Sequence, residues 1–151
     1  MIEIVTFKKA HYIELMAGNV IEHTLSRTPA VVAATAEIFA SRGPAFTAML
    51  GREILGCAGV MIMWPGVGEA WAVFNEKVSL LFKKEAYVYA ANHLYAIIKH
   101  KNLHRVQAHC RVDLPKAIRY AENLGFKREA VMEKYDEDGT DHYLYAMVIK
   151  Q

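Results

Sequence analysis

Long apolar runs are absent from this chain of 151 residues. A transmembrane helix needs roughly 20 consecutive apolar residues, and no segment approaches that length, so no membrane partner is expected. Residues 1–5 carry an acid and suit a β-strand better than a secretory signal peptide. The cytoplasm is expected instead from the two cysteines described next, which favour a reducing compartment.

Cysteine is also scarce, and basic residues are not concentrated in one segment. Cys57 and Cys110 each lie inside an apolar run typical of a strand, which favours buried, reduced thiols over a disulfide. The 18 Lys and Arg residues are scattered along the chain, and the formal net charge is only +2. A nucleic-acid binder would gather its basic residues on one face, so nucleic acid is not an expected partner.

Metal-binding patterns are missing although the chain has seven histidines. His100 and His104 are four residues apart, but the next strand region begins between them, so the two side chains do not share a helix face. His93 and His109 have no partner at metal-ligand spacing, and residues 136–139 lack the ligand pattern of a calcium loop. No metal cofactor is expected.

The chain does contain enough apolar sequence, 54% of its residues, for one packed domain over residues 1–151. Turn residues and hydrophobic periodicity divide that domain into strands and helices. Strands are predicted over residues 2–7, 45–50, 54–63, 69–75, 105–111, 129–135 and 142–149, with the apolar strand 54–63 at the centre. Helices are predicted over residues 8–17, 29–41, 79–101 and 114–124, with a short helix in 19–27. This order predicts an α/β domain with a mixed sheet and a parallel crossover from strand 69–75 to strand 105–111.

A local motif accompanies this order of elements. Residues 114–126 read LPKAIRYAENLGF, and a polar strand, an Asp-Gly turn at 138–139 and the sequence YLYAM at 143–147 follow. The motif and the order of elements resemble the GNAT N-acetyltransferases, whose corresponding segment reads N-P-x-A-I-R-L-Y-E-K-L-G-F. The resemblance covers nearly the whole chain. It implies a mostly antiparallel sheet splayed in the middle with helices on both faces, and direct transfer of an acetyl group from acetyl-CoA to an amine.

A narrower resemblance is carried by residues 68–71, Gly-Glu-Ala-Trp, and by the glycine-free segment that begins with residues 82–84. The GNAT-like proteins of tailed phages combine such a Gly-x-x-W strand with a long helix that lacks glycine. This resemblance implies an alternative to an enzyme, namely a catalytically degenerate structural or accessory module such as a virion protein, in the host cytoplasm or the virion. An acyl-CoA sensor without turnover and a homodimer also stay open.

The GNAT resemblance implies two contacts with coenzyme A. The pyrophosphate would lie at residues 82–87, or 83–88 in a shifted register, where lysines at a helix N-terminus attract phosphate unless they are ordinary solvated residues. Neither register contains a glycine of the family's Q/R-x-x-G-x-G/A loop. The pantetheine arm would lie where the strands 69–75 and 105–111 separate, unless Trp71 or Phe74 fills that slot. The cofactor-binding residues implied in this way are Val73, Phe74, Asn75, Lys83, Lys84, Ala86, Tyr87, Ala117 and Tyr120.

The general acid is where the chain departs most clearly from the family. The family's tyrosine, which protonates the departing thiolate, aligns with Ala121, and the asparagine that opens its helix aligns with Leu114. Tyr120 lies one residue away, turned by about 100° around the helix. Tyr143 or Tyr145 could reach the same space from the last strand. The catalytic acid is therefore predicted to be Tyr120 or Tyr143.

The general base implied by the resemblance is Glu69, at the start of the splayed strand, with Glu22 as the alternative. A carboxylate at that position would accept the proton that the amine must lose. The departures from the family's pattern leave catalytic activity itself open. No feature of the sequence indicates which amine is the acceptor.

Overall fold

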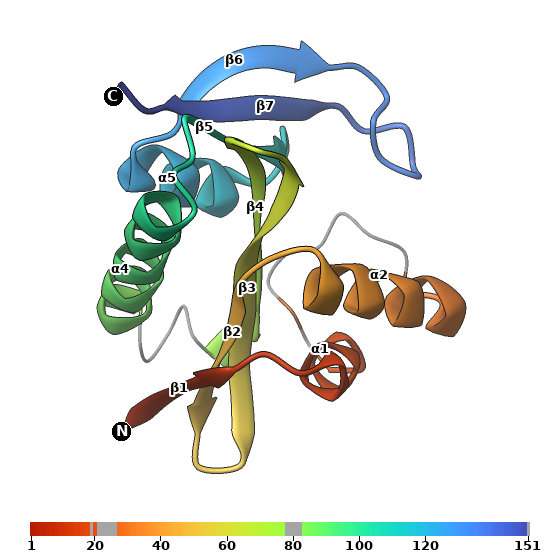
Figure 1. Cartoon of the computed structure of the whole chain (residues 1–151). Helices are drawn as coiled ribbons and strands as arrows, with labels where there is room; N and C mark the ends of the chain where they lie inside the picture. Colours follow the sequence, from red (N-terminus) through yellow and green to blue (C-terminus); the bar gives the residue numbers. More distant parts are fainter. Residues whose placement is uncertain (19, 21–26, 78–82, 151) are drawn as a thin grey trace.

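The computed structural model describes residues 1–18, 20, 27–77 and 83–150, and its strands form one seven-stranded sheet in the order β1-β2-β3-β4-β5-β7-β6. The strands are β1 (Ile2–Thr6), β2 (Ala45–Leu50), β3 (Glu53–Trp64), β4 (Val67–Phe74), β5 (Arg105–Arg111), β6 (Lys127–Met132) and β7 (His142–Val148). The helices are α1 (Lys9–Met16), α2 (Pro29–Ser41), α4 (Lys83–His100) and α5 (Pro115–Leu124). Helices α1 and α2 cover one face of the sheet, and α4 and α5 cover the other (Figure 1). The predicted α/β architecture with helices on both faces is confirmed.

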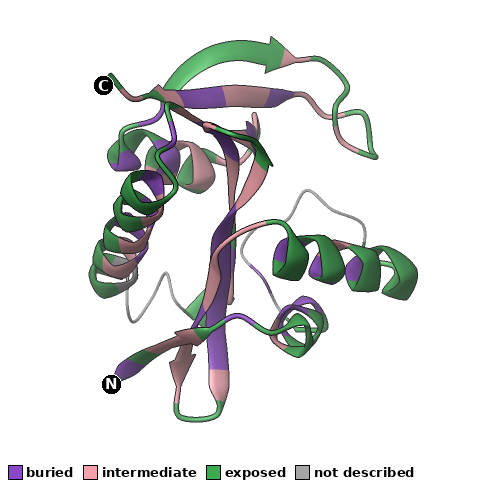
Figure 2. Ribbon diagram, in the orientation of Figure 1, coloured by how far each residue is buried: buried purple, intermediate pink, exposed green. Residues whose placement is uncertain are grey.

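The sheet is antiparallel at every neighbouring pair except β4 and β5, which run parallel. Helix α4 lies between these two strands in the chain, so the predicted crossover is confirmed. Strand β3 is paired on both edges and is buried along most of its length (Figure 2). A strand covered on both faces needs apolar side chains at consecutive positions. This explains the apolar run that predicted a central strand.

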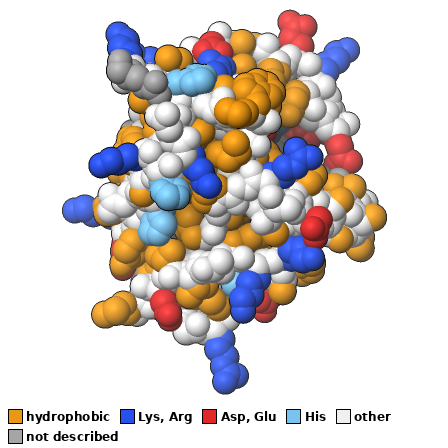
Figure 3. All heavy atoms as spheres, viewed as in Figure 1, with side chains coloured by type: hydrophobic (Ala, Val, Ile, Leu, Met, Phe, Trp, Pro, Cys, Tyr) orange, Lys and Arg blue, Asp and Glu red, His pale blue; other side chains and the backbone are white. Residues whose placement is uncertain are grey.

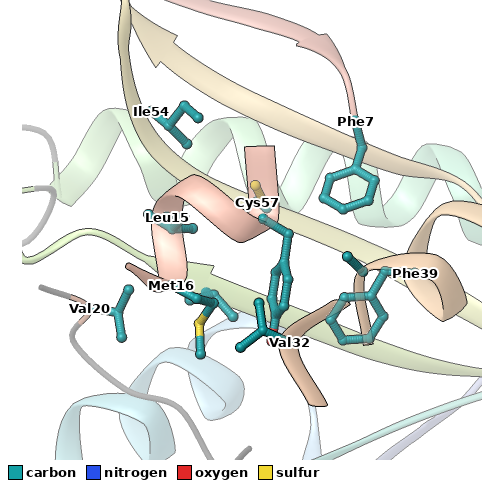
Figure 4. Close-up of a cluster of buried hydrophobic side chains, with 11 residues drawn as sticks. Phe7, Leu15, Met16, Val20, Val32, Phe39, Ile54 and Cys57 are labelled. Carbon is teal, nitrogen blue, oxygen red and sulfur yellow. The ribbon is translucent and has the colours of Figure 1, made fainter. Parts of the chain in front are cut away.

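Aromatic rings build the core between the sheet and helices α1 and α2 (Figure 4). Tyr12 is fully buried and meets Phe39 edge-on with ring centroids 5.4 Å apart. Trp71 of β4 stacks on the same Phe39 ring at 3.7 Å. Helix α2 contributes Val32 and Ala36 beside Phe39, because residues three and four apart share one helix face. Each ring pair adds about 1 kcal/mol to the free energy gained from burial alone.

A second core packs α4 and α5 against β5 and β7. Two tyrosine hydroxyls of α4 tie this helix to the end of α5. Tyr87 donates to the carbonyl of Asn123 and Tyr95 donates to the carbonyl of Leu124, both at 2.6 Å. These bonds satisfy carbonyls that a helix end leaves without an intrahelical partner, and they set the separation of the two helices.

The two cysteines lie in different cores and form no disulfide. Cys57 belongs to the core under α1 and α2, and burial raises the pKa of its thiol to about 12. Cys110 belongs to the core under α4 and α5. The prediction of buried, reduced thiols is confirmed.

Some predicted boundaries need correction. Strand β6 spans Lys127–Met132 rather than residues 129–135. Lys134 adopts φ 53° and its N–H donates to Asp141 Oδ1 at 2.9 Å, so the chain has already left the ladder at this point. The predicted start of the long helix at Ser79 and most of the segment 19–27 lie outside the described residues.

The surface of the described chain carries no concentrated charge on the face seen in Figure 3, where acidic and basic side chains are interspersed. Across the described ranges, no helix combines the length and the apolar character needed to cross a membrane.

Candidate functional site

Strands β4 and β5 separate in the middle of the sheet. Their parallel pairing covers only Val67 with Arg105, Gly68 with Val106 and Glu69 with Gln107. Beyond these pairs β4 continues to Phe74 and β5 continues to Arg111 without pairing to each other. This is the predicted splay, and it leaves the edge of β4 that faces β5 without a partner strand from Ala70 to Ala72 among the described residues, while Asn75 just beyond β4 forms an isolated antiparallel bridge with Val20.

The register identifies which backbone groups of β4 face the gap. The N–H of Asn75 donates to the carbonyl of Leu55 at 2.8 Å, which directs Asn75 toward β3. Backbone direction alternates along an antiparallel strand, so Val73 also turns toward β3, whereas Phe74 and Ala72 turn toward the gap. Of the three backbone positions predicted for cofactor binding, Phe74 is the one whose N–H and C=O turn toward the splay, next to the isolated bridge between Asn75 and Val20.

A cavity of about 730 Å³ lies between the sheet and helices α4 and α5, and it reaches the splay. Its size is in the range of small-molecule sites. Trp71 and Phe74 border the cavity without filling it, since Trp71 is held against Phe39 on the far side of the sheet. Small side chains give the cavity its width, namely Ala58, Gly59, Ala70, Ala72, Ala108, Ala117 and Ala121.

Tyr120 lies on the cavity wall opposite the exposed backbone of β4. Its ring meets Phe74 edge-on at 5.5 Å and Tyr87 edge-on at 6.2 Å. The Tyr120 hydroxyl is buried and has no hydrogen-bond partner among the described residues. Burial, followed by the nearby Tyr87, raises the pKa of Tyr120 above its ordinary value, so the group keeps its proton. Although Tyr120 is turned away from Ala121 on the helix, both residues line the cavity.

The other candidate acids are placed differently. Tyr143 does not line the cavity, and the guanidinium of Arg128 lies 3.6 Å from the centre of its ring. Tyr145 is fully buried, and its hydroxyl donates to Glu122 Oε2 at 3.0 Å. The structure therefore brings Tyr120 to the cavity and leaves both tyrosines of β7 outside it.

Three exposed cations border the cavity. Lys84 belongs to α4, whereas Lys116 and Arg119 belong to the first turns of α5. Sequence reasoning proposed Lys84 but missed Lys116 and Arg119, although each is the immediate sequence neighbour of a predicted cofactor residue, Ala117 and Tyr120 respectively. The side chains of Lys83 and Ala86 lie outside the described part of the structure. Positive charge from two helices at one cavity suits a phosphorylated ligand.

Charge reversal tests this assignment. Lys116→Glu and Arg119→Glu are each expected to weaken acetyl-CoA binding by about tenfold, because each removes a cation from a phosphate and adds an anion. Salt screens such contacts, so the loss should be larger at low ionic strength. Calorimetric titration measures it, and Lys99→Glu at the far end of α4 is the matched control. Affinities unchanged at low salt would remove both residues from the site.

The opposite face of the splay carries polar side chains. Glu69, the predicted base, accepts a hydrogen bond from Gln107 at 3.4 Å and does not line the cavity. Burial, then the negative charges of Glu69 and Asp136, raise the pKa of the neighbouring Tyr135. Glu22, the alternative base, lies outside the described residues.

A hydrogen-bonded chain on this same face was missed by sequence reasoning. His109 Nδ1 lies 2.9 Å from His142 Nδ1, and His142 Nε2 lies 3.0 Å from Asp136 Oδ2. Arg111 binds Asp136 at 2.9 Å from the other side. His109 lies on β5 at the splay and is among the residues that border the cavity, so these hydrogen bonds lead from a buried carboxylate to a residue next to the candidate site, with the imidazole on the face opposite α4 and α5.

Comparison with known proteins shows which solved structures share this architecture. No protein-family model and no curated protein sequence matches the chain. Among solved structures, the ribosomal-protein-S18-alanine N-acetyltransferase from Escherichia coli superposes with a TM-score of 0.75 at 14% identity, over 100% of this chain and 96% of that one. The IAA acetyltransferase from Bacillus cereus superposes with a TM-score of 0.75 at 13% identity, over 99% and 100%. A GNAT-family acetyltransferase from Streptococcus pneumoniae gives 0.72 at 15% identity, over 99% and 100%.

The chain therefore has the GNAT fold. Its backbone superposes on these acetyltransferases along nearly their full length. Identity this low demonstrates a common fold and no more, so the activity has to be argued from the site.

Proposed function

We propose that this protein is an acetyl-CoA-dependent N-acetyltransferase that passes an acetyl group directly to an amine. One observation carries the proposal. An open cavity of about 730 Å³ reaches the place where β4 and β5 separate and where Ala70 and Ala72 of β4 have no pairing with β5. The pantetheine arm is a chain with amide groups, so it can pair with an open strand edge as another strand would.

The residues around the cavity suit the two ends of this cofactor. Lys84, Lys116 and Arg119 would hold its phosphates. The backbone N–H of Phe74, which faces the splay, would donate to the thioester oxygen as negative charge develops on it. The hydroxyl of Tyr120 would protonate the sulfur when the C–S bond breaks, since it is protonated and has no competing partner among the described residues.

Calorimetric titration with acetyl-CoA, with coenzyme A as the comparison, tests the proposal. Micromolar binding is expected, followed by thiol release when a primary amine is added from a panel that includes an N-terminal alanine peptide, a polyamine and an aromatic amine. Absence of heat, together with no rise in melting temperature at millimolar ligand, would overturn the proposal, because even weak binding stabilises a folded protein. Binding without thiol release from any amine would favour the acyl-CoA sensor.

The alternative of a non-catalytic module, such as a virion protein, has one observation in its favour. Strand β6 forms one edge of the sheet, and five of its six residues are exposed. An exposed edge strand can pair with a strand from another chain, including a second copy of this one. In that case the protein should purify with a partner bound at β6, and the cavity should stay empty. A cytoplasmic location belongs to the enzyme proposal, and a host cytoplasm or virion location belongs to the alternative.

Glu69 and Tyr143 stay predictions. The carboxylate of Glu69 lies on the face of the sheet that is opposite α4 and α5, where it would attract a cationic amine. The ring of Tyr143 is covered by the guanidinium of Arg128 and does not border the cavity.

A further inference from the structure

Asp136, His142 and His109 are joined by hydrogen bonds that run from the protein interior toward the cavity. Asp136 and His142 are buried, with side chains 6% and 0% exposed, whereas His109 is half-buried and borders the cavity. Within the described residues, Nε2 of His109 has no hydrogen-bond partner. The series of hydrogen bonds therefore starts at a buried carboxylate and ends at His109, a residue that borders the cavity and whose Nε2 carries no hydrogen bond within the described chain.

The charge of Asp136 decides where the hydrogens sit along this chain. Burial opposes its ionisation, but hydrogen bonds from His142, Arg111 and the backbone of Glu137 hold the pKa of Asp136 below its ordinary value. An ionised carboxylate only accepts hydrogen bonds, so Nε2 of His142 carries a hydrogen. In neutral His142 the other nitrogen, Nδ1, is then a lone pair that accepts from Nδ1–H of His109. This tautomer leaves Nε2 of His109 as a lone pair that can accept a proton.

We propose that His109 is the general base for the amine, with His142 and Asp136 as positioning residues that receive its charge. The inference rests on the proposed acetyl transfer. Nε2 of His109 takes a proton from the bound ammonium, and Nδ1–H of His109 passes to Nδ1 of His142. His109 gains one proton at Nε2 and loses one from Nδ1, so it ends neutral. The positive charge ends on the imidazolium of His142, which stays paired with the carboxylate of Asp136.

The rest of the reaction then balances. The free amine attacks the thioester carbon, the C–N bond forms and the C–S bond breaks. Tyr120 gives its proton to the sulfur, and the second proton of the amine replaces it on Tyr120. The products are the amide and coenzyme A thiol, with one proton left on the pair of His142 and Asp136 for release to water.

His109 is better placed for this step than Glu69, because it borders the cavity and Glu69 does not. The groups that face His109 are His142, Asp136 and the ring of Tyr135 at 4.9 Å. Burial, followed by the nearby His142, lowers the pKa of His109 to about 4, so its ring is neutral near pH 7. A base this weak holds a proton poorly, and the transfer to His142 beside Asp136 supplies the missing stabilisation.

Two substitutions test the relay. In His109→Asn the amide nitrogen can still donate to His142, but no base remains at the cavity. In Asp136→Asn the amide can donate to Nε2 of His142, which reverses both tautomers and places a hydrogen on Nε2 of His109. His100→Asn, at the exposed end of α4, is the control and should match the wild type.

Both variants are expected to lower kcat/KM by about 10²- to 10⁴-fold at pH 7 with the amine panel, without changing the dissociation constant of acetyl-CoA. The ratio of the wild-type kcat/KM to that of His109→Asn should fall by about tenfold per pH unit from pH 6 to 9. The reason is that the variant can use only amine that is already deprotonated in solution. A purely structural role would not produce this pH dependence. Melting temperatures show whether each variant is folded.

The outcomes separate this inference from the proposed function. Wild-type protein that does not bind acetyl-CoA would overturn both. An active wild type whose kcat/KM survives in His109→Asn across the pH range would overturn the role of His109 alone. Nitrogen-15 NMR adds a readout without activity: hydrogen on Nδ1 of His109 and on Nε2 of His142 supports the relay, and the opposite tautomers overturn it.

Discussion

Ala72→Phe is expected to abolish acetyl-CoA binding while the protein stays folded. Ala72 lies on β4 beside the splay, borders the cavity and is exposed in the structure. A phenyl ring at this position would occupy the space of the pantetheine arm without displacing core side chains. We expect binding to weaken by at least about 100-fold, or about 2.7 kcal/mol, in a calorimetric titration.

The matched control is Ala130→Phe, the same change on an exposed strand position of β6, far from the cavity lining. It should bind acetyl-CoA as the wild type does, with both melting temperatures close to that of the wild type. If Ala72→Phe bound as tightly as Ala130→Phe, the ligand would lie elsewhere and the cavity would lose its proposed role.

Tyr120→Phe is expected to lower kcat by about 10²-fold with little change in the affinity for acetyl-CoA. Only the hydroxyl is lost, and that hydroxyl belongs to a ring that contacts Phe74 at the cavity wall. Because the hydroxyl is buried without a partner among the described residues, its removal should not destabilise the fold. Steady-state rates of thiol release, with unfolding by denaturant in parallel, measure both effects.

Tyr12→Phe is the control for this change, since its hydroxyl is also buried without a partner in the described part of the chain. Tyr12 belongs to the core under α1 and α2, on the other side of the sheet. Its kcat should stay within about twofold of the wild type, as for an ordinary core position. Equal losses in both variants would show that Tyr120 acts through packing rather than as an acid.

The elements of the fold could be predicted because their signals are local. The spacing of Val32, Ala36 and Phe39 predicted one buried face of α2, and the structure buries all three. The apolar run of β3 predicted a strand covered on both faces. The end of β6 could not be predicted this way, because the chain leaves the ladder when Asp136 turns inward to Arg111 and His142, which belong to other strands.

The candidate site was only partly within reach of the sequence. The motif in residues 114–126 led to Ala117 and Tyr120, and both line the cavity. Lys116 and Arg119 could have been found from the same helix turns. The angle of about 100° between neighbouring helix positions argued against Tyr120 as a replacement for a tyrosine at position 121. The cavity next to α5 is wide enough, however, that both Tyr120 and Ala121 line it.

By itself, the sequence determined the order of strands and helices, their buried faces and the crossover that sets β4 beside β5, because these follow from periodicity and turn chemistry along a continuous stretch of chain. The tertiary structure alone decided that His109, which borders the cavity, meets the buried His142, 33 residues away. That contact depends on the pairing of β5 with β7 and on the inward turn of Asp136, and non-local pairing leaves no periodic signal in either segment.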